Sequence, residues 1–151
     1  MIEINNLVKR YGNTRAVNGI SFTVNDGEVL GFLGPNGAGK STTMNIITGY
    51  LSSTSGSVLV DGHDILEDPV AAKKNIGYLP ELPPLYFDMT VREYLNFVCD
   101  LKKVPSSERK AQINKILSMV HITDYADRLI GNLSKGYKQR VGMAQAMVGD
   151  P

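Results

Sequence analysis

The sequence predicts an α/β fold in its N-terminal half and an all-helical arrangement in its C-terminal half. Three observations predict this division. A glycine-rich run over residues 34–41 lies between an apolar run and a stretch with helical character. Short apolar segments separated by turn residues surround this run. Beyond Pro80, apolar residues recur at helical spacing.

The elements of the first half are mainly strands. Partial alternation of apolar and polar residues predicts strands over residues 2–11 and 17–24. A turn over residues 25–28 leads to Val-Leu-Gly-Phe-Leu at residues 29–33, which predicts a buried strand. Residues 58–60 predict another strand, which an Asp-Gly turn ends.

Two helices and a last strand complete this half. The glycine-rich run is expected to lead directly into a helix that ends near Thr48. A short helix is expected over residues 68–74, because Pro69 suits a first helical turn. Residues 75–79 predict a strand that stops at Pro80.

Apolar spacing predicts three helices in the second half. Thr90 is the expected N-cap of the first, and the second begins near Ser106 or Ser107. The third begins near Ser134. The apolar residues that define the three helical faces are Val91, Leu95 and Val98, then Ile113, Ile116, Leu117 and Val120, then Val141, Ala144, Met147 and Val148.

Composition narrows the class of protein. The 151 residues carry a formal net charge of +1, and no basic cluster is interleaved with aromatic residues, so we expect no nucleic-acid partner. The single Cys99 excludes an internal disulfide and is expected in the core. His63 and His121 are expected at the surface. No apolar run approaches the ~20 residues of a membrane span, and no signal peptide precedes the first strand, so we expect a cytoplasmic location.

The run Gly34 to Ser41 fits G-x-x-x-x-G-K-[ST], a phosphate-binding loop. Glycines let the backbone turn tightly, so that successive N–H groups form an anion-binding nest. The helix that follows adds its positive N-terminal end. Lys40 supplies a cation for the β- and γ-phosphates, and Ser41 supplies a hydroxyl ligand for Mg²⁺. A glycine-rich turn without ligand is the alternative, and such a turn needs neither Lys40 nor Ser41.

The run Leu133 to Val141 (L-S-K-G-Y-K-Q-R-V) resembles the signature sequence of ABC (ATP-binding cassette) ATPases, usually L-S-G-G-Q followed by a basic, apolar helix. Residues 144–151 also match this family. Residues 9–12 (K-R-Y-G) and 76–81 (I-G-Y-L-P-E) are two further landmarks in family order. In detail the chain looks most like ATPase subunits of ABC-2 type exporters, including gliding-motility and multidrug-type members.

The resemblance implies a P-loop ABC ATPase fold: a core with a mixed sheet and helices over residues 1–81, and an all-helical signature subdomain over residues 82–151. It implies ATP and Mg²⁺ as cofactors and two ATPs sandwiched in a head-to-tail dimer. Ser41 and Glu81 are the expected metal ligands. The residues that the resemblance assigns to ATP are Tyr11 (adenine), Val17 (ribose and base), Gly34, Pro35, Asn36, Gly37, Ala38, Gly39, Lys40, Ser41 and Thr42 (phosphates and Mg²⁺), and Ser134, Lys135 and Gly136 (the ATP of the other subunit).

Three positions depart from the family pattern. Lys135 replaces a signature glycine and Tyr137 replaces the glutamine, while Ser134 and Gly136 remain. A lysine at this position could add a cation near the γ-phosphate. Glu81 stands where most of the family has glutamine, and its carboxylate suits Mg²⁺ directly or through water; a solvated surface charge is the alternative.

The family continues past Pro151 into a strand, a catalytic Glu, a dimer-contact loop and a switch His. We therefore expect this sequence to be a fragment, without its C-terminal part and with no catalytic residue of its own. The missing strand would lie beside residues 29–33, so apolar side chains there would lack partners. No residue of the chain is assigned as the general base, and we expect residues 1–151 alone to hydrolyse ATP very slowly or not at all.

The expected parent is the ATP-binding subunit of an ABC transporter, with export as the expected direction, at the inner face of the cytoplasmic membrane. Its expected partners are a multi-span membrane subunit and a second ATP-binding subunit. The apolar stretch with Leu85, Tyr86 and Phe87 either helps to dock the membrane subunit or packs inside the helical subdomain. Two other functions stay open: a soluble ABC ATPase of ribosome or DNA metabolism, and a regulatory module that holds nucleotide without turnover.

Overall fold

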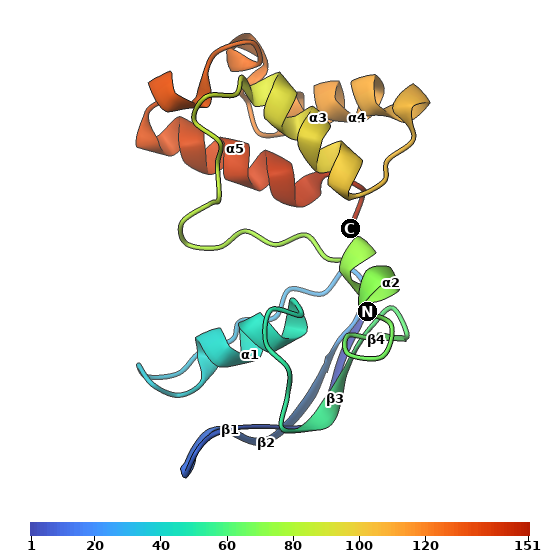
Figure 1. The fold of residues 1–151 in the computed structure, drawn as a ribbon, viewed down its shortest axis with the longest axis vertical. Helices are drawn as coiled ribbons and strands as arrows, with labels where there is room; N and C mark the ends of the chain where they lie inside the picture. Colours follow the sequence, from blue (N-terminus) through green and yellow to red (C-terminus); the bar gives the residue numbers. More distant parts are fainter. The chain divides into compact units, whose positions relative to one another are not determined.

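The computed structural model describes residues 1–151, which divide into two compact units, Met1–Ile76 and Gly77–Pro151 (Figure 1). The N-terminal unit contains a four-stranded antiparallel sheet and two helices. The C-terminal unit contains α-helices and short 3₁₀ helices and has no strand. None of the helices combines the length and apolarity that crossing a membrane requires.

The sheet of the N-terminal unit has the strand order β2-β1-β3-β4. Its strands are β1 (Ile2–Tyr11), β2 (Thr14–Val24), β3 (Ser55–Val60) and β4 (His63–Asp64). Central β1 pairs with β2 on one side and with β3 on the other. The sequence predicted the first three strands, although β2 and β3 begin three residues before the expected starts. The two-residue β4 is too short to leave an apolar pattern.

Helices α1 (Lys40–Ile47) and α2 (Pro69–Lys74) complete this unit. Both confirm the prediction, and Asp68 caps α2 by accepting a hydrogen bond from the backbone N–H of Ala71. The core joins strand residues to one face of α1. Its buried members are Ile4, Leu7, Val17, Ile46, Ile47, Val58, Val60, Ile65 and Ala72.

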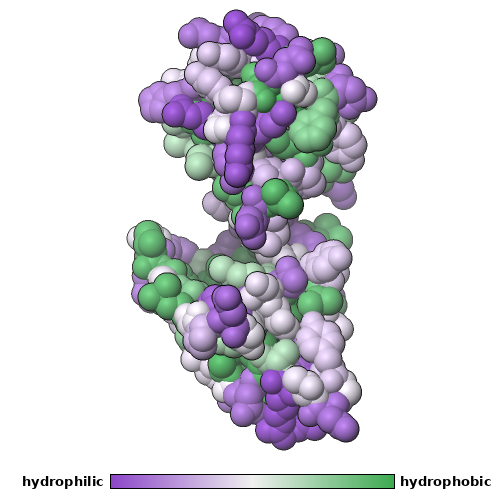
Figure 2. All heavy atoms as spheres, turned by 90° about the vertical axis from the view of Figure 1, so that its left-hand side faces the viewer, coloured by the Kyte–Doolittle hydropathy of each residue, from purple (hydrophilic) through white to green (hydrophobic).

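The strand predicted over residues 29–33 is wrong for this chain. These residues pair with no strand, and the side chains of Val29 and Leu33 are 96% and 91% exposed. Phe32 keeps an aromatic contact, its ring centroid lying 5.6 Å from that of Phe22. Figure 2 shows hydrophobic side chains at the surface of this N-terminal unit. An apolar run becomes a strand only where a neighbouring strand accepts its backbone hydrogen bonds, and none does so here.

The strand predicted over residues 75–79 is also wrong, and the reason is the same. The chain leaves α2 through Asn75, the C-cap of that helix, and then runs without regular structure to Pro80. No strand of the sheet pairs with this segment. Apolar composition alone therefore misled the assignment twice, each time where no partner strand is present.

The C-terminal unit contains α3 (Val91–Leu101), α4 (Ser106–Met119) and α5 (Lys135–Met147), with 3₁₀ helices η1 (Thr123–Tyr125) and η2 (Ile130–Asn132) between α4 and α5. All three α-helices confirm the prediction. Thr90 and Glu93 form a capping box at the start of α3: each side chain accepts a hydrogen bond from the backbone N–H of the other residue.

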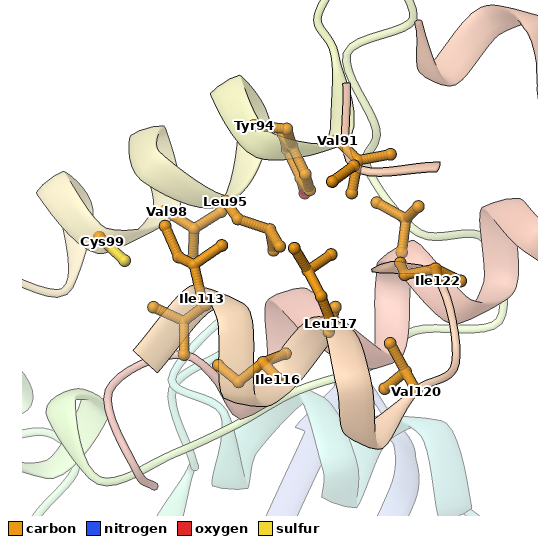
Figure 3. Packing of buried hydrophobic residues seen from close by; sticks show 14 of the residues in the cluster. Val91, Tyr94, Leu95, Val98, Cys99, Ile113, Ile116, Leu117, Val120 and Ile122 are labelled. Carbon is orange, nitrogen blue, oxygen red and sulfur yellow. The ribbon is translucent and has the colours of Figure 1, made fainter. Parts of the chain in front are cut away.

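The apolar faces of α3, α4 and α5 meet in one core, together with residues of the connecting segments (Figure 3). Leu95, Leu117 and Val141 are fully buried, and they come from three different helices. Cys99 is fully buried as well, which confirms its expected place in the core. Arg92 ties α3 to its neighbours, because it donates hydrogen bonds to Asp127 at 2.8 Å and to Asn114 at 3.2 Å.

Candidate functional site

The glycine-rich run precedes α1, the helix that it was expected to open. Gly39 is the N-cap of α1 and has a φ of 90°, and Gly37 has a φ of 82°. Both values lie in the left-handed region that glycine adopts without strain. No side chain caps the helix, and its first turn contains no acidic residue. The N–H groups at the start of α1 therefore lack both a side-chain acceptor and a neighbouring negative charge.

Gly39 also sets how closely the loop approaches β2. A Cβ atom at this position would lie 2.2 Å from the carbonyl oxygen of Ala16 and 3.3 Å from Cγ2 of Val17. Only glycine permits this approach. Val17 is 4% exposed and belongs to the core beneath the loop. The structure thus brings Val17 together with the glycine-rich run, in contact with its last glycine.

Lys40 folds back over the loop that precedes it. Its Nζ donates hydrogen bonds to the carbonyl oxygens of Gly34 at 2.5 Å and of Pro35 at 2.7 Å. The ammonium group is therefore held at the loop instead of extending into solvent. Residues 34–38 and Ser41 are exposed, and Thr42 is half-buried. The arrangement places a cation, a hydroxyl group and the positive end of a helix at one accessible loop.

This donor-rich loop fits a phosphate group. Uncapped helix N–H groups and a lysine are complementary to an anion, and the lack of acidic residues in the first turn removes repulsion. The chain holds no group of three or more His, Cys, Asp or Glu that could bind a metal ion by itself. Within this loop the Ser41 hydroxyl is the side-chain oxygen that suits a Mg²⁺ ion, beside the oxygens of a bound phosphate.

Tyr11 lies at the end of β1, beside the β1–β2 turn, and its side chain is 49% exposed. Nζ of Lys9 lies 5.3 Å from the centroid of the Tyr11 ring and donates a 2.7 Å hydrogen bond to the carbonyl oxygen of Ser52. Lys9 was not among the predicted site residues. Its position two residues before Tyr11 on the same strand places both side chains on one face, and this is the signal that could have found it.

The signature run lies in the C-terminal unit, at the start of α5. Ser134 is the N-cap of this helix, and its Oγ accepts a hydrogen bond from the backbone N–H of Tyr137 at 3.5 Å. Ser134, Lys135 and Gly136 are exposed, and a Cβ atom at Gly136 would meet nothing within 4 Å. The three residues thus form an open helix start in a unit separate from that of the phosphate-binding loop.

Tyr137, half-buried, packs against Tyr125 with ring centroids 4.1 Å apart. Hydrogen bonding to Tyr125 raises the pKa of the Tyr137 phenol, and burial raises it further. No local pattern in the sequence pointed to Tyr125, because the pair joins η1 to α5 across twelve residues of chain. Glu81, the second expected metal ligand, is exposed in the segment before α3. Leu82, Tyr86 and Phe87 in the same segment are 83%, 49% and 58% exposed.

The family model described as ABC transporter matches residues 17–151. ABC transporter A family member 1 of Dictyostelium discoideum is 40% identical over 136 residues, which are 90% of this chain and 16% of that protein. The uncharacterized ABC transporter ATP-binding protein YxlF of Bacillus subtilis is 39% identical over 151 residues, which are 100% of this chain and 50% of that protein. The chain therefore spans half or less of the length of these relatives.

Solved structures of ABC transporter proteins are similar to this chain in fold. The cbiO1 protein of Clostridium perfringens, described as part of the ABC transporter complex cbiONQ, superposes with a TM-score of 0.86 and 29% identity over 99% of this chain and 62% of that chain. A dimeric bacterial ABC transporter cassette superposes with a TM-score of 0.84 and 27% identity over 100% of this chain and 71% of that chain.

Proposed function

The chain belongs to the ABC transporter family and has the fold of its ATPase cassettes, and on this premise we propose that it binds MgATP as part of a transport ATPase. The observation that carries the proposal is the loop before α1. Its helix start is uncapped and free of acidic residues, and Lys40 is held at the loop. These features suit the triphosphate of a nucleotide.

The proposed roles follow the positions of the residues. The backbone from Gly34 to Gly39 and the side chain of Lys40 hold the phosphates, with the N–H groups of Ser41 and Thr42 at the helix start. The Ser41 hydroxyl ligates Mg²⁺, and the Glu81 carboxylate is its second proposed ligand. The exposed ring of Tyr11 stacks on adenine. Val17 supports the loop from below and borders the ribose.

For the whole protein we propose ATP hydrolysis in a head-to-tail dimer that powers transport, with export as the direction. Ser134, Lys135 and Gly136 would face the ATP held by the second ATP-binding subunit. Their exposure and the open space around Gly136 are compatible with such a contact. We assign no general base within residues 1–151 and place the catalytic Glu beyond Pro151.

The proposed location is the inner face of the cytoplasmic membrane, through a multi-span membrane subunit. The segment before α3 supports this proposal, since Leu82 and Phe87 expose most of their apolar side chains. Charged substitutions at Tyr86 and Phe87 are expected to weaken assembly with the membrane subunit. Assembly that survives both substitutions would contradict this docking role.

The test begins with binding of a fluorescent ATP analogue to residues 1–151 and to the complete protein, with and without Mg²⁺. Lys40→Ala is expected to weaken binding at least about tenfold, equivalent to about 1.4 kcal/mol. Lys74→Ala, a lysine in the last turn of α2, is the matched control and should bind like wild type. Equal binding by the Lys40→Ala variant would contradict the proposed site.

Measurement of ATP hydrolysis distinguishes a transport ATPase from a regulatory nucleotide-binding module. Hydrolysis by the complete protein, with binding alone by residues 1–151, is the expected result. Binding without hydrolysis in both would favour a regulatory nucleotide-binding module. Turnover by residues 1–151 at the rate of the complete protein would contradict the absence of a catalytic base from this part of the chain.

A further inference from the structure

The start of α5 is held by side chains directly behind the exposed turn. Tyr137 packs against Tyr125 of η1, with ring centroids 4.1 Å apart and an angle of 31° between the ring planes. The guanidinium of Arg128, which lies between η1 and η2, is 4.8 Å from the centroid of the Tyr125 ring. Both tyrosines pack, partly buried, against the helical core. The pair therefore joins α5 to a segment that is itself anchored.

Two cations extend this attachment. Arg140 lies 5.8 Å from the Tyr137 ring, and its guanidinium donates hydrogen bonds to the carbonyl oxygens of Val120 at 3.0 Å and His121 at 3.4 Å, just past the end of α4. Lys138 donates to the carbonyl oxygen of Gly131 at 3.1 Å, and its Nζ lies 5.0 Å from the Phe87 ring centroid. The side chains of Tyr137, Lys138 and Arg140 thus reach four different segments of the unit.

The turn itself has almost no such support. Ser134, Lys135 and Gly136 are exposed, and no atom lies within 4 Å of a Cβ position at Gly136. Ser134 accepts two hydrogen bonds there, one at its Oγ from the backbone N–H of Tyr137 at 3.5 Å and one at its carbonyl oxygen from the backbone N–H of Lys138 at 2.9 Å. Tyr137 and Lys138 therefore link the exposed turn to the anchored part of the unit, and Tyr137 does so through the packing of its ring.

We propose that Tyr137 is a positioning residue for the Ser134–Gly136 turn, and that it acts through its ring contact with Tyr125. Tyr137 replaces the glutamine of the usual signature, so the ring contact with Tyr125 depends on a residue that the usual signature lacks. The pair fixes the direction of the first turn of α5, and with it the place where the Ser134 hydroxyl and the Lys135 ammonium meet a phosphate. This inference rests on the proposed function.

The raised pKa of the Tyr137 phenol supports its contact with Tyr125. The pKa of Tyr137 is raised because its phenol shares a hydrogen bond with Tyr125 and because it is partly desolvated. The nearby guanidinium groups of Arg140 and Arg128 oppose this rise and do not cancel it. A freely rotating surface tyrosine would lack the hydrogen bond and its effect on the pKa.

The test uses the complete protein and a double-mutant cycle of Tyr125→Ala and Tyr137→Leu, with Tyr137→Phe as the conservative variant. For each protein, kcat and KM for ATP and the affinity for a fluorescent ATP analogue are measured, together with ATP-dependent self-association. Phe97→Leu is the matched control: it also removes an aromatic contact of this unit, that of Phe97 with Tyr86 at 5.5 Å, at a place remote in sequence from the turn.

Each single substitution of the pair is expected to lower kcat about tenfold, or about 1.4 kcal/mol, while affinity for the analogue stays within twofold, because the phosphate-binding loop is untouched. The double variant should be no slower than the slower single variant, since both remove the same contact. Tyr137→Phe retains the ring and should restore kcat to within about twofold of wild type. Phe97→Leu should leave kcat unchanged.

Failure of the inference and failure of the proposed function give different results. A wild-type protein that binds no ATP would contradict the proposed function and this role with it. Normal binding and turnover in wild type, with kcat unchanged by Tyr137→Leu, would overturn the positioning role alone. Additive losses in the double variant would show that the two tyrosines act independently, which also overturns it.

Discussion

The two units of the chain differ in whether their apolar segments have partners to pack against or pair with. In the C-terminal unit each α-helix buries an apolar face against the others, and Thr90 and Glu93 close the start of α3. In the N-terminal unit the sheet has its own core, but the apolar residues 29–33 form no strand and expose Val29 and Leu33. A helix satisfies most of its backbone hydrogen bonds within itself, whereas a strand needs a neighbour.

The same contrast separates the two helix starts that carry the candidate phosphate-binding residues, one in each unit. The turn at Ser134 begins with a side-chain cap and is held by Tyr137. The phosphate-binding loop begins α1 with Gly39 and no side-chain cap. The N–H groups left without a cap are those that a phosphate would satisfy, so the less complete helix start is the better anion site.

The largest expected effect tests the helical core. Leu117→Ala should lower the free energy of unfolding of the C-terminal unit by about 3 kcal/mol, because this fully buried side chain leaves a cavity. Urea unfolding followed by circular dichroism measures it. Met119→Ala on the same helix, at a side chain that is 54% exposed, should cost less than about 0.5 kcal/mol. Equal losses in the two variants would contradict the described core.

Next in size is the close approach of the loop to β2. Gly39→Ala should destabilise the N-terminal unit by about 2 kcal/mol and abolish binding of a fluorescent ATP analogue, because the φ of 90° and the 2.2 Å approach to Ala16 both exclude a Cβ atom. Gly31→Ala is the control, since a Cβ atom there meets nothing within 4 Å. Undiminished binding by the Gly39→Ala variant would mean that the loop adopts another conformation.

A smaller effect is expected from the local cap of the helical unit. Thr90→Ala removes the acceptor for the Glu93 N–H and should cost about 1 kcal/mol of unfolding free energy. Urea unfolding again provides the measurement, with Thr123→Ala as a control at a threonine that makes no side-chain cap. A loss below the error of the measurement would show that packing alone determines where α3 begins.

The dependence of stability on pH tests the same capping box. Hydrogen bonds from Thr90 hold the pKa of Glu93 below its ordinary value of 4.5. Because the folded pKa is the lower one, the stabilisation is present above pH 4.5 and is lost as the pH falls through the folded value. Glu93→Gln should therefore flatten the fall of stability in acid, and Glu108→Gln in the first turn of α4 serves as the control. If Glu93→Gln left the dependence of the unfolding free energy on acidic pH unchanged, the stabilising role of the ionised Glu93 carboxylate would be contradicted.

The smallest effect is expected where the N-terminal unit exposes its apolar run. Leu33→Ser should change the unfolding free energy of residues 1–151 by less than about 0.5 kcal/mol, because 91% of this side chain is already exposed. Val58→Ser in the buried part of β3 is the contrasting variant, at 1% exposure. A loss of several kcal/mol at Leu33 would show that residues 29–33 lie in a paired strand after all.

Local signals by themselves determined most of the elements and the main site motif. The periodicity of α3, α4 and α5, the caps Thr90 and Ser134, and the glycine run before α1 are all encoded within a few neighbouring residues. Helix starts and tight glycine turns depend on interactions of short range, so the sequence predicts them well.

Tertiary structure decided what depends on partners distant in sequence. It left residues 29–33 and 75–79 without strand pairing, and it brought Gly39 against Ala16 and Tyr137 against Tyr125. No local pattern specifies such contacts, because a strand's hydrogen bonds, the closeness of two backbones and the stacking of two rings all depend on where the remote partner lies.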